Sequence, residues 1–423
     1  MHSSVPRRRT NGRSKTLLRF DPPTIMASHS RVICYHVRSG GKRRHSKEGE
    51  IFLKKSDRCG VVVRYSEPDC GRPDLHEHVS RNETARKLAA LKGFEFAGDY
   101  DPAKRYTGQL YFVPDDTLIG VEAARRLGIH DEQDLFGGIV PYPFVATKTI
   151  THPLVDGAAQ APAGWRHDLA DRLSDAVLFG FTAFSRADAR KAGILVLERS
   201  PARFKPPCGI GGRGQAVVSN ITELDEVIES LDPVELSRDG IVIEQNFANI
   251  VTYSVGQVRV GDLLATYYGT QSLTKDNSAA EVYGGSSLIV ARGDYDDLLK
   301  LDIAPNVQSV IVKARAYETA VAEVFPEWMA SRRNYDVAEA TDSATHVGVL
   351  EQSWRIGGAS PAEIAALQAF QADPGLRAVR AASAEIYGTA EVPPQASVHF
   401  QGIDERLGPI TKYSVVQAYD SSQ

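Results

Sequence analysis

A lysine followed by a glycine-rich stretch is the part of the chain best suited to hold phosphate. The stretch reads RFKPPCGIGGRGQAVVS from residue 203, with Lys205 ahead of the glycines. In a turn between two strands, backbone N–H groups can close over phosphates while a lysine ammonium neutralises their charge. A flexible surface hairpin with a solvated lysine is the alternative. The glycines available for backbone contact are Gly209, Gly211, Gly212 and Gly214.

The residues after Gly214 exclude two other glycine-rich phosphate motifs. The spacing satisfies G-x-G-x-x-G, but a dinucleotide fingerprint continues into a helix, and here the apolar segment QAVVS follows instead. A helix begins only after Asn220, which with Glu223 is spaced as a capping box. A Walker A loop would need lysine where Gln215 stands. The sequence therefore predicts a strand–turn–strand flap, which is typical of nucleotide-dependent phosphoryl transfer.

Two carboxylates further along the chain could bind a hard cation. Asp336 lies in NYDVAEA and Glu351 in VLEQSWRIGG, where alternation along an extended segment places Glu351, Ser353 and Arg355 on one face. Mg²⁺ (or Mn²⁺) prefers oxygen ligands and usually bridges nucleotide phosphates through one or two carboxylates, with Ser353 available as a hydroxyl ligand. Arg355 would hold a phosphoryl group or a substrate carboxylate through its planar guanidinium. A solvated edge strand is the alternative.

A strand that ends in a carboxylate lies between these two regions, in DGIVIEQNF. Adenine needs an acceptor for its exocyclic amine, backbone groups along its edge and an apolar face for stacking. Glu244, the backbone near Asn246, and Phe247 could supply these three contacts. By itself, however, the segment is also an ordinary strand end.

The hydrophobic pattern predicts the elements that position these residues. From Val32 onward, short apolar runs alternate with helical patterns, which predicts a parallel α/β layer. Asp115, Asp116 and Thr117 are expected to cap a helix that stops at Gly128. The predicted elements are strands in VICYHV, VVVRY, QLYFVPDD and between residues 202 and 268, helices over 82–91, 118–127, 165–176, 187–192 and 307–328, and a strand, a loop and a helix in VGVLEQSWRIGGASPAEIAAL.

Length and composition indicate several folded domains. At roughly 150 residues per domain, 423 residues suggest two or three, and 42% hydrophobic residues are enough to build their cores. Glycine and proline punctuate the chain between the first α/β layer and the flap, which places a boundary close to residue 146. The expected divisions are a disordered basic tail (1–29), a first α/β domain (30–145), a lobe with the flap (146–248), a lobe with the metal site (249–400) and a C-terminal tail (401–423).

The charge and cysteine content indicate which partners the protein is expected to lack and in which compartment it is expected to lie. Forty-nine Lys and Arg against 53 Asp and Glu give a net charge of −4, which argues against nucleic acid and anionic membranes as partners. The first 26 residues are basic but lack the apolar run of a secretory signal. The four cysteines, Cys34, Cys59, Cys70 and Cys208, fit neither a zinc pattern nor a disulfide scaffold, so we expect free thiols in the cytoplasm.

In order and spacing, these stretches resemble the ATP-grasp superfamily over roughly residues 30–400, and the segment EQSWRIGG is similar to a proteobacterial group described as biotin carboxylase-like. The resemblance implies an α/β fold with α+β lobes, in which a Rossmann-like preATP-grasp domain precedes the two lobes. It implies that Lys205 is the phosphate-binding lysine and Glu244 the adenine-contacting hinge glutamate. It also implies that Asp336 and Glu351 are the metal acids and Arg355 the catalytic arginine.

Some features match this family less closely. Lys148 in VATKTI resembles the earlier lysine of the fold, but it lies farther than usual from the following GFT segment. Ser353 replaces the usual asparagine of the metal segment. After Arg355 no acid follows that could deprotonate bicarbonate, which disfavours biotin carboxylase activity. Gly357 and Gly358 are expected to leave room for a bulkier substrate.

The function that the resemblance implies is an ADP-forming carboxylate ligase that uses ATP and Mg²⁺. Its partners would be a small-molecule carboxylate and an amine or thiol, and a homodimer is compatible with the sequence. A small-molecule kinase on the same fold and a non-catalytic nucleotide-binding module are the alternatives. Histidines such as His152, His167 and His346 are expected to serve structure rather than catalysis.

Overall fold

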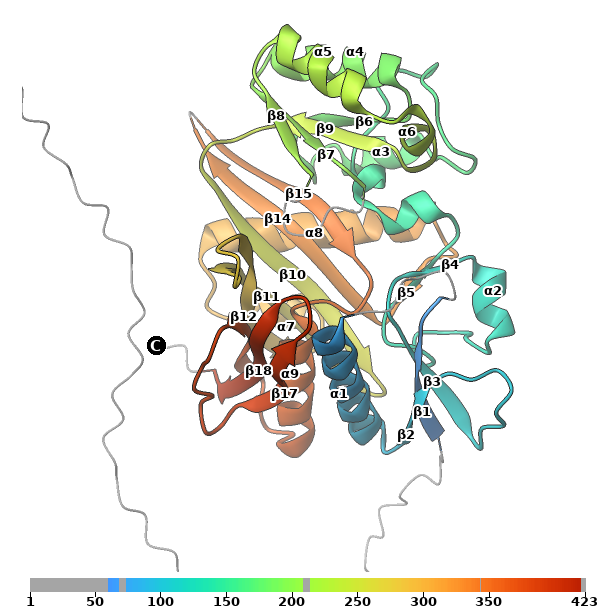
Figure 1. Cartoon of the computed structure of the whole chain (residues 1–423), viewed down its shortest axis with the longest axis vertical. Helices are drawn as coiled ribbons and strands as arrows, with labels where there is room; N and C mark the ends of the chain where they lie inside the picture. Colours follow the sequence, from blue (N-terminus) through green and yellow to red (C-terminus); the bar gives the residue numbers. More distant parts are fainter. Residues whose placement is uncertain (1–59, 68–73, 208–213, 343, 420–423) are drawn as a thin grey trace, which may run out of the picture. The chain divides into compact units, whose positions relative to one another are not determined.

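The computed structural model of the chain describes residues 60–67, 74–207, 214–342 and 344–419 (Figure 1). The described part is a mixed α/β structure, which confirms the fold class predicted from the sequence. The predicted basic tail, the predicted strand VICYHV, all four cysteines and three of the flap glycines (Gly209, Gly211 and Gly212) lie outside the described residues.

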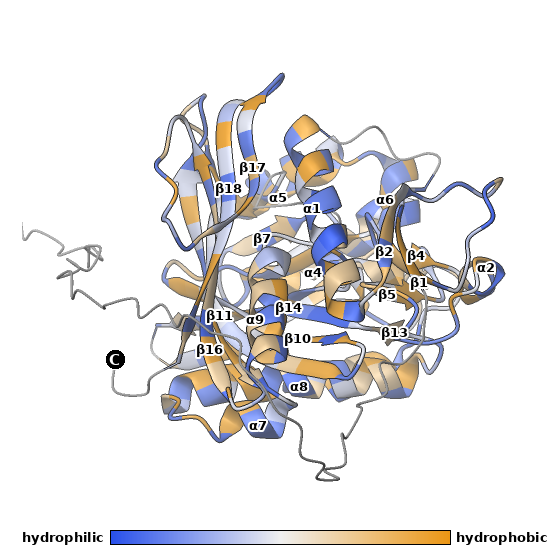
Figure 2. Ribbon diagram, turned by 90° about the horizontal axis from the view of Figure 1, so that it is seen from below, coloured by the Kyte–Doolittle hydropathy of each residue, from blue (hydrophilic) through white to orange (hydrophobic). Residues whose placement is uncertain are grey.

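The described chain begins with a three-stranded parallel sheet of order β2-β1-β3. Its strands, in that order, are Glu95–Asp99, Gly60–Tyr65 and Gln109–Pro114. The valines of β1 are buried, as expected for a parallel strand covered on both faces. Helix α1 (Leu75–Lys92) joins β1 to β2 and ends at Gly93, which adopts the left-handed conformation (φ 67°). Figure 2 shows hydrophobic residues, in orange, in the strands around β1. The predicted parallel α/β layer is therefore present.

One predicted helix begins later than expected. Leu118 and Ile119 form strand β4, which pairs in parallel with β5 (Gly138–Val140), and β5 also pairs with β13 (Met329–Ala330). Helix α2 covers only Val121–Arg126 and begins after Gly120, so Asp115, Asp116 and Thr117 do not cap it. Burial of Leu118 in the sheet explains the difference, because pairing with β5 satisfies backbone groups that a helix would otherwise use.

The flap belongs to a four-stranded sheet with the order β6-β9-β7-β8. Its strands are Gly180–Ala183, Ile241–Gln245, Ala202–Lys205 and Ala216–Val218, and helices α4 (Arg186–Leu197), α5 (Ile221–Ser230) and α6 (Pro233–Asp239) accompany them. Strands β7 and β8 are antiparallel, so the glycine-rich segment connects two paired strands, as predicted. Asn220 caps α5 by accepting a hydrogen bond from the Glu223 N–H at 3.0 Å. Two 3₁₀ turns, η1 (Pro143–Ala146) and η2 (Lys148–Thr151), and helix α3 (Asp168–Leu173) precede this sheet.

The remaining strands form an eight-stranded antiparallel sheet with the order β15-β14-β10-β11-β12-β16-β18-β17. In that order they are Thr345–Ser353, Arg332–Thr341, Ile250–Val260, Leu263–Lys275, Glu281–Arg292, Ala378–Tyr387, Gly408–Ala418 and Ser397–Asp404. The segment expected as a C-terminal tail, 401–423, instead contains the end of β17 and all of β18. The buried residues of β18 are Ile410, Thr411 and Ser414.

Two helices cover different parts of this sheet. Helix α8 (Pro305–Val324), near the short helix α7 (Tyr295–Leu299), packs with apolar residues of β10, β14 and β15 in one core. Helix α9 (Ser360–Ala372) packs with β11, β12 and β16 in another. Residues of β10, β14 and β15 that alternate with the α8-facing ones therefore lie on the opposite face, beside α9. The candidate site lies on this face.

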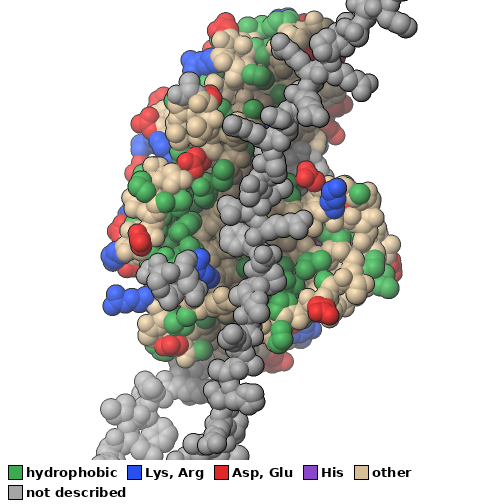
Figure 3. Space-filling model, turned by 90° about the vertical axis from the view of Figure 1, so that its left-hand side faces the viewer, with side chains coloured by type: hydrophobic (Ala, Val, Ile, Leu, Met, Phe, Trp, Pro, Cys, Tyr) green, Lys and Arg blue, Asp and Glu red, His purple; other side chains and the backbone are tan. Residues whose placement is uncertain are grey.

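The described surface carries charges of both signs. On the face shown in Figure 3, Lys and Arg side chains lie scattered among Asp and Glu. Among the described residues, the structure contains no helix with the length and apolar character needed to cross a membrane.

Candidate functional site

The predicted metal acids are direct neighbours on adjacent strands. Asp336 of β14 pairs with Glu351 of β15, and Asn334 pairs with Ser353 two residues away. Because residues two apart along a strand share a face, these four side chains belong to one face of the sheet. The structure thus brings together Asp336, Glu351 and Ser353, and adds Asn334, which the sequence analysis missed.

The carboxylate of Asp336 is oriented by three hydrogen bonds to a single oxygen. Its Oδ1 accepts from Ser254 Oγ at 3.2 Å, from Gln271 Nε2 at 3.0 Å and from Asn334 Nδ2 at 3.2 Å. Among the described residues, none hydrogen-bonds Oδ2 of Asp336. Burial and the nearby charge of Glu351 raise the pKa of Asp336 to about 6, because these effects outweigh the three donors. The arrangement leaves one oxygen available for a cation.

Lys148 lies beside the second acid. Its Nζ is 2.5 Å from Oε2 of Glu351, and the lysine is 4% exposed. The one-turn helix that carries it is anchored on both sides. Gln352 of β15 donates to the Thr147 carbonyl at 2.6 Å, and the Thr182 hydroxyl of β6 donates to the Thr149 carbonyl at 2.7 Å. The 148–151 turn therefore connects the small sheet with the strand that carries Glu351.

Lys205 forms a second buried ion pair, with Glu244. Lys205 ends β7, and its Nζ contacts Oε1 of Glu244 on the neighbouring strand β9. The other carboxylate oxygen of Glu244 lies 3.1 Å from Nε2 of His152. Burial alone would raise the pKa of Glu244, which is 2% exposed, but Lys205 and His152 together lower it to about 2. Glu244 is therefore ionised and holds Lys205 in place.

His152 is a residue of this site to which the sequence analysis gave only a structural role. It is 1% exposed, and it directly follows the turn that carries Lys148. Its Nδ1 is buried and has no hydrogen-bond partner in the described structure. The proximity of His152 to Lys148 along the chain was the one signal available, since its contact with Glu244 depends on folding.

The predicted hinge residues make contacts of their own. The Asn246 N–H donates to the Pro201 carbonyl at 2.9 Å, and its side-chain oxygen accepts from Arg203. The ring of Phe247 packs against His346, with 4.9 Å between ring centroids. The backbone N–H of Asn246 thus already has a protein partner. An adenine-contacting role for Glu244, Asn246 and Phe247 stays a prediction, as does phosphate contact by Gly214, which has a positive φ of 74°.

Arg355 lies beyond the end of the strand on which alternation was expected. Strand β15 ends at Ser353, and the Arg355 guanidinium reaches Asp116, with 3.6 Å between Nε and Oδ1. Ser353 and Glu351 share a face, whereas the position of Arg355 is set by the loop that follows. The Ser353 hydroxyl lies 3.3 Å from a guanidinium nitrogen of Arg332, a second residue that the sequence analysis missed.

One of the two loop glycines does not leave the space that was expected. A Cβ on Gly358 would clash with the ring of Tyr283, which occupies that position. The Tyr283 hydroxyl contacts Ser286 and Ser383, and Ser383 donates to the Gly358 carbonyl at 2.8 Å. Gly358 is thus required for close packing rather than for a bulkier substrate. A Cβ on Gly357 would meet only the Arg332 guanidinium, at 3.6 Å.

One described protein family matches most of this chain. The family described as "Protein of unknown function (DUF3182)" matches residues 64–414. The chain belongs to this family. No curated protein matches it.

Solved structures with similar folds include three enzymes. N5-carboxyaminoimidazole synthetase from Staphylococcus aureus is 11% identical, with 85% of this chain and 93% of that chain covered and a TM-score of 0.47. Phosphoribosylamine–glycine ligase from Thermotoga maritima is 13% identical, with coverages of 85% and 92% and a TM-score of 0.47. A biotin carboxylase–ATP-analogue complex from Campylobacter jejuni is 11% identical, with coverages of 85% and 87% and a TM-score of 0.44.

The donor set on this face of the DUF3182 chain suits a hard cation bound together with a phosphate ligand. Among the described residues, no three His, Cys, Asp or Glu side chains cluster as a metal site. The oxygen donors on this face are the carboxylates of Asp336, whose Oδ2 accepts no hydrogen bond from a described residue, and of Glu351, together with the Ser353 hydroxyl. Mg²⁺ commonly binds in this way, because it retains water and takes other oxygen ligands from nucleotide phosphates.

Proposed function

We propose that this DUF3182 protein is an ATP-grasp ligase that forms ADP and phosphate. It would transfer the γ-phosphoryl group of ATP to a carboxylate, and an amine or thiol would then displace phosphate from the acyl phosphate. The observation that supports this most strongly is a chain of neighbouring charged groups. Asp336 pairs with Glu351, which contacts Lys148, and the turn that carries Lys148 leads directly to His152. His152 in turn contacts Glu244, the partner of Lys205.

The two lysines are suited to bind phosphate. Both are almost fully buried, and each is paired with a glutamate. A buried ammonium group requires an anionic partner, and phosphate oxygens could take the place of the carboxylates. In the proposed complex, Lys205 would contact phosphate beneath the glycine-rich flap, and Lys148 would contact it from the 148–151 turn. Their charges would neutralise the charge that develops on the phosphoryl oxygens.

The metal ion would be held by Asp336 and Glu351, with the Ser353 hydroxyl as a further ligand. When bound, Mg²⁺ would neutralise phosphate oxygens and align the triphosphate. The three donors on Oδ1 of Asp336 would direct its Oδ2 toward the ion. The fit rests on the chemistry of these oxygen donors.

Arg355 would bind the acceptor. Its guanidinium is 31% exposed, and its partner Asp116 is 71% exposed, so this pair is weak and open to exchange. A substrate carboxylate or the transferred phosphoryl group could replace Asp116. Because Asp116 belongs to the loop after β3, the first α/β domain would border the acceptor site.

The test is identification of the products. The purified protein is incubated with MgATP and pools of carboxylic acids with and without amines or thiols, and nucleotides are resolved by chromatography. ADP and free phosphate that depend on both a carboxylate and a nucleophile are expected. AMP as the initial nucleotide product would contradict the acyl-phosphate mechanism. Phosphate retained on the acceptor would indicate the kinase, and MgATP binding without turnover would indicate the non-catalytic module.

A further inference from the structure

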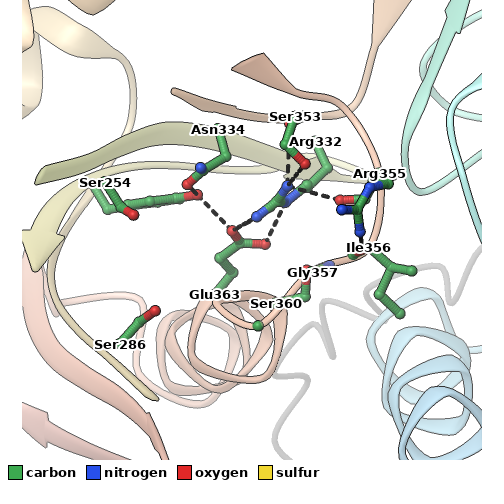
Figure 4. A network of polar contacts seen from close by, with 12 residues as sticks. Ser254, Ser286, Arg332, Asn334, Ser353, Arg355, Ile356, Gly357, Ser360 and Glu363 are labelled. Atoms are coloured by element: carbon green, nitrogen blue, oxygen red, sulfur yellow. Dashed lines mark hydrogen bonds and ion pairs between the residues drawn. The ribbon is translucent and has the colours of Figure 1, made fainter. Parts of the chain in front are cut away.

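A buried polar network lies directly behind the proposed metal and acceptor groups. Its centre is Arg332, which is 2% exposed, and its partner Glu363 of α9, which is fully buried (Figure 4). The Nε of Arg332 lies 3.1 Å from both carboxylate oxygens of Glu363, and NH2 lies 2.8 Å from Oε1. One edge of the guanidinium is therefore satisfied by the ion pair.

The other edge of Arg332 holds the chain where it leaves the sheet. Its NH1 donates to the Arg355 carbonyl at 2.7 Å, the Ser353 carbonyl at 3.2 Å and the Ser353 hydroxyl at 3.3 Å (Figure 4). Strand β15 ends at Ser353, so the strand ladder does not fix the backbone that follows. A buried ion pair alone would not need these additional acceptors. Arg332 instead fixes the backbone that carries Arg355.

A tyrosine connects this ion pair with the metal acid. The Tyr267 hydroxyl, which is fully buried, lies 2.5 Å from Oε1 of Glu363 and 2.9 Å from Oδ1 of Asn334. The other side-chain atom of Asn334, Nδ2, donates to Oδ1 of Asp336. These contacts extend from the Arg355 backbone to the Asp336 carboxylate, with the single hydroxyl proton of Tyr267 donated to Glu363 or to Asn334 at any one time.

The path of this contact depends on one glycine. Tyr267 lies on β11 and Asn334 on β14, and strand β10 runs between them. The residue of β10 at the crossing is Gly256, which pairs with both Tyr267 and Asn334 in register. A Cβ at this position would clash with the Tyr267 hydroxyl and ring. Because Gly256 has no side chain, the Tyr267 ring can cross over β10 and reach Asn334.

We propose that Arg332, Glu363 and Tyr267 are positioning residues that fix Arg355 relative to Asp336. The inference rests on the proposed function, in which Arg355 binds the acceptor and Asp336 holds the metal. In-line phosphoryl transfer depends on the separation of these two groups, and misplacement of about 1 Å slows such reactions roughly 100-fold. The network is a rigid connection between them, and it does not itself contact nucleotide or acceptor.

The test uses conservative variants and a matched control. Arg332→Lys keeps a cation beside Glu363 but removes the donors to residues 353 and 355, and Tyr267→Phe removes only the bridging hydroxyl. Tyr295→Phe is the control. Tyr295 is also a buried tyrosine bonded to a glutamate, Glu318, at 3.0 Å, but it packs in the core beneath α8. Thermal unfolding of each variant identifies any that does not fold.

Hydrogen exchange measures positioning without reference to activity. In Arg332→Lys, peptide amides of residues 354–358 are expected to exchange about tenfold faster than in the wild type or in Tyr295→Phe. ADP formation in Arg332→Lys and Tyr267→Phe is expected to show a kcat lowered roughly 10–100-fold with the KM for ATP within about twofold of wild type, the range found for outer-shell partners. Tyr295→Phe is expected to keep both constants.

The outcomes separate the inference from the function on which it rests. Unchanged exchange of residues 354–358 in folded Arg332→Lys would overturn the positioning role, whatever the protein catalyses. A change in KM with kcat preserved would also overturn it, because the network would then act on nucleotide binding. Faster exchange in a protein whose wild type forms no ADP would support the link between Arg332 and this segment and refute only the proposed ligase activity.

Discussion

Lys148 and Glu351 form an ion pair, with 2.5 Å between Nζ and Oε2, although the sequence assigns the lysine to the nucleotide and the glutamate to the metal. The lysine is 4% exposed and the glutamate 34%, so the contact lies at the edge of the buried region. A metal ion that binds Glu351 must compete with this ammonium group. Nucleotide phosphate would relieve the competition, because it offers Lys148 another anion.

The first prediction follows from this competition. In the absence of nucleotide, Lys148→Met should bind Mn²⁺ about tenfold more tightly than the wild type, because the variant removes a cation next to the metal carboxylate. Titration followed by electron paramagnetic resonance measures this directly. Lys300→Met is the control, since Lys300 pairs with Asp297 at 2.8 Å on the exposed surface. Equal Mn²⁺ affinity in Lys148→Met and wild type would show that Lys148 does not compete with the metal ion for Glu351.

The Lys205–Glu244 pair predicts a loss of both activity and stability. Lys205→Met should slow ADP formation by about 10² or more, roughly 3 kcal/mol of barrier, because phosphate charge is no longer neutralised. From the sequence alone, this lysine would be expected to contribute little to the fold. Because Glu244 is 2% exposed, however, the variant leaves a buried carboxylate whose remaining partner among the described side chains is His152, and breaking such pairs costs about 3–5 kcal/mol.

A double variant separates these two effects. Lys205→Met/Glu244→Gln removes both charges, so it should regain most of the unfolding free energy lost in Lys205→Met while remaining inactive. Denaturant unfolding and the ADP assay measure the two quantities. Recovery of activity together with stability would mean that Lys205 supports the fold and does not act on phosphate.

Local patterns predicted much of the site. The paired strands on either side of the glycine-rich segment, the capped helix after them and the strand–loop–helix around Glu351 all follow from short-range sequence signals, and the described structure contains them. Glu351 was expected on an extended segment, whereas no element was predicted around Asp336, which lies on β14. Their direct pairing, however, depends on the register between β14 and β15, which turn and packing geometry set.

Other parts of the site depend on contacts between different strands, which a single sequence does not reveal. Ser254, Gln271 and Tyr267 are ordinary strand residues until β10, β11 and β14 pair and bring them to Asp336 and Asn334. Alternation failed at Arg355 because the strand ends two residues earlier. The C-terminal strands were different, since the β-branched and aromatic residues of ITKYSVV were a local signal for a strand that the sequence analysis passed over.

The raised pKa of Asp336 predicts a pH-dependent stability. Its folded-state pKa of about 6 lies above the ordinary value of 3.8, because burial and Glu351 disfavour the ionised form. The contribution of the protonated acid to stability is therefore fully present below about pH 4 and is lost as the pH rises through 6. Asp336→Asn should thus raise the unfolding temperature at pH 7.5 and change it little at pH 4. At pH 7.5 the rise should be about 2–4 °C for each 1 kcal/mol that the variant adds to the free energy of unfolding.

Metal-free protein is required for this comparison, since a bound cation favours the ionised carboxylate. Scanning calorimetry in EDTA at both pH values provides the measurement. Asp296→Asn, at an exposed acid paired with Arg315, is the control and should show no such pH-dependent gain. A variant of Asp336 that is less stable than wild type at pH 7.5 would show that its three hydrogen bonds outweigh the cost of burying its charge.

The last prediction concerns Ser353, whose hydroxyl has two candidate roles. It shares a face with Glu351 and Asp336, as a metal ligand would, and it also lies 3.3 Å from Arg332. If it binds the metal, Ser353→Asn should keep or raise Mg²⁺ affinity, because the carboxamide supplies an oxygen with longer reach, and Ser353→Ala should weaken it. The Mg²⁺ concentration for half-maximal ADP formation measures this. Since Arg332 keeps its two backbone acceptors in both variants, exchange of residues 354–358 should be unchanged. An alanine variant with wild-type Mg²⁺ dependence would leave the hydroxyl only its contact with Arg332, and the metal would then rest on the two carboxylates.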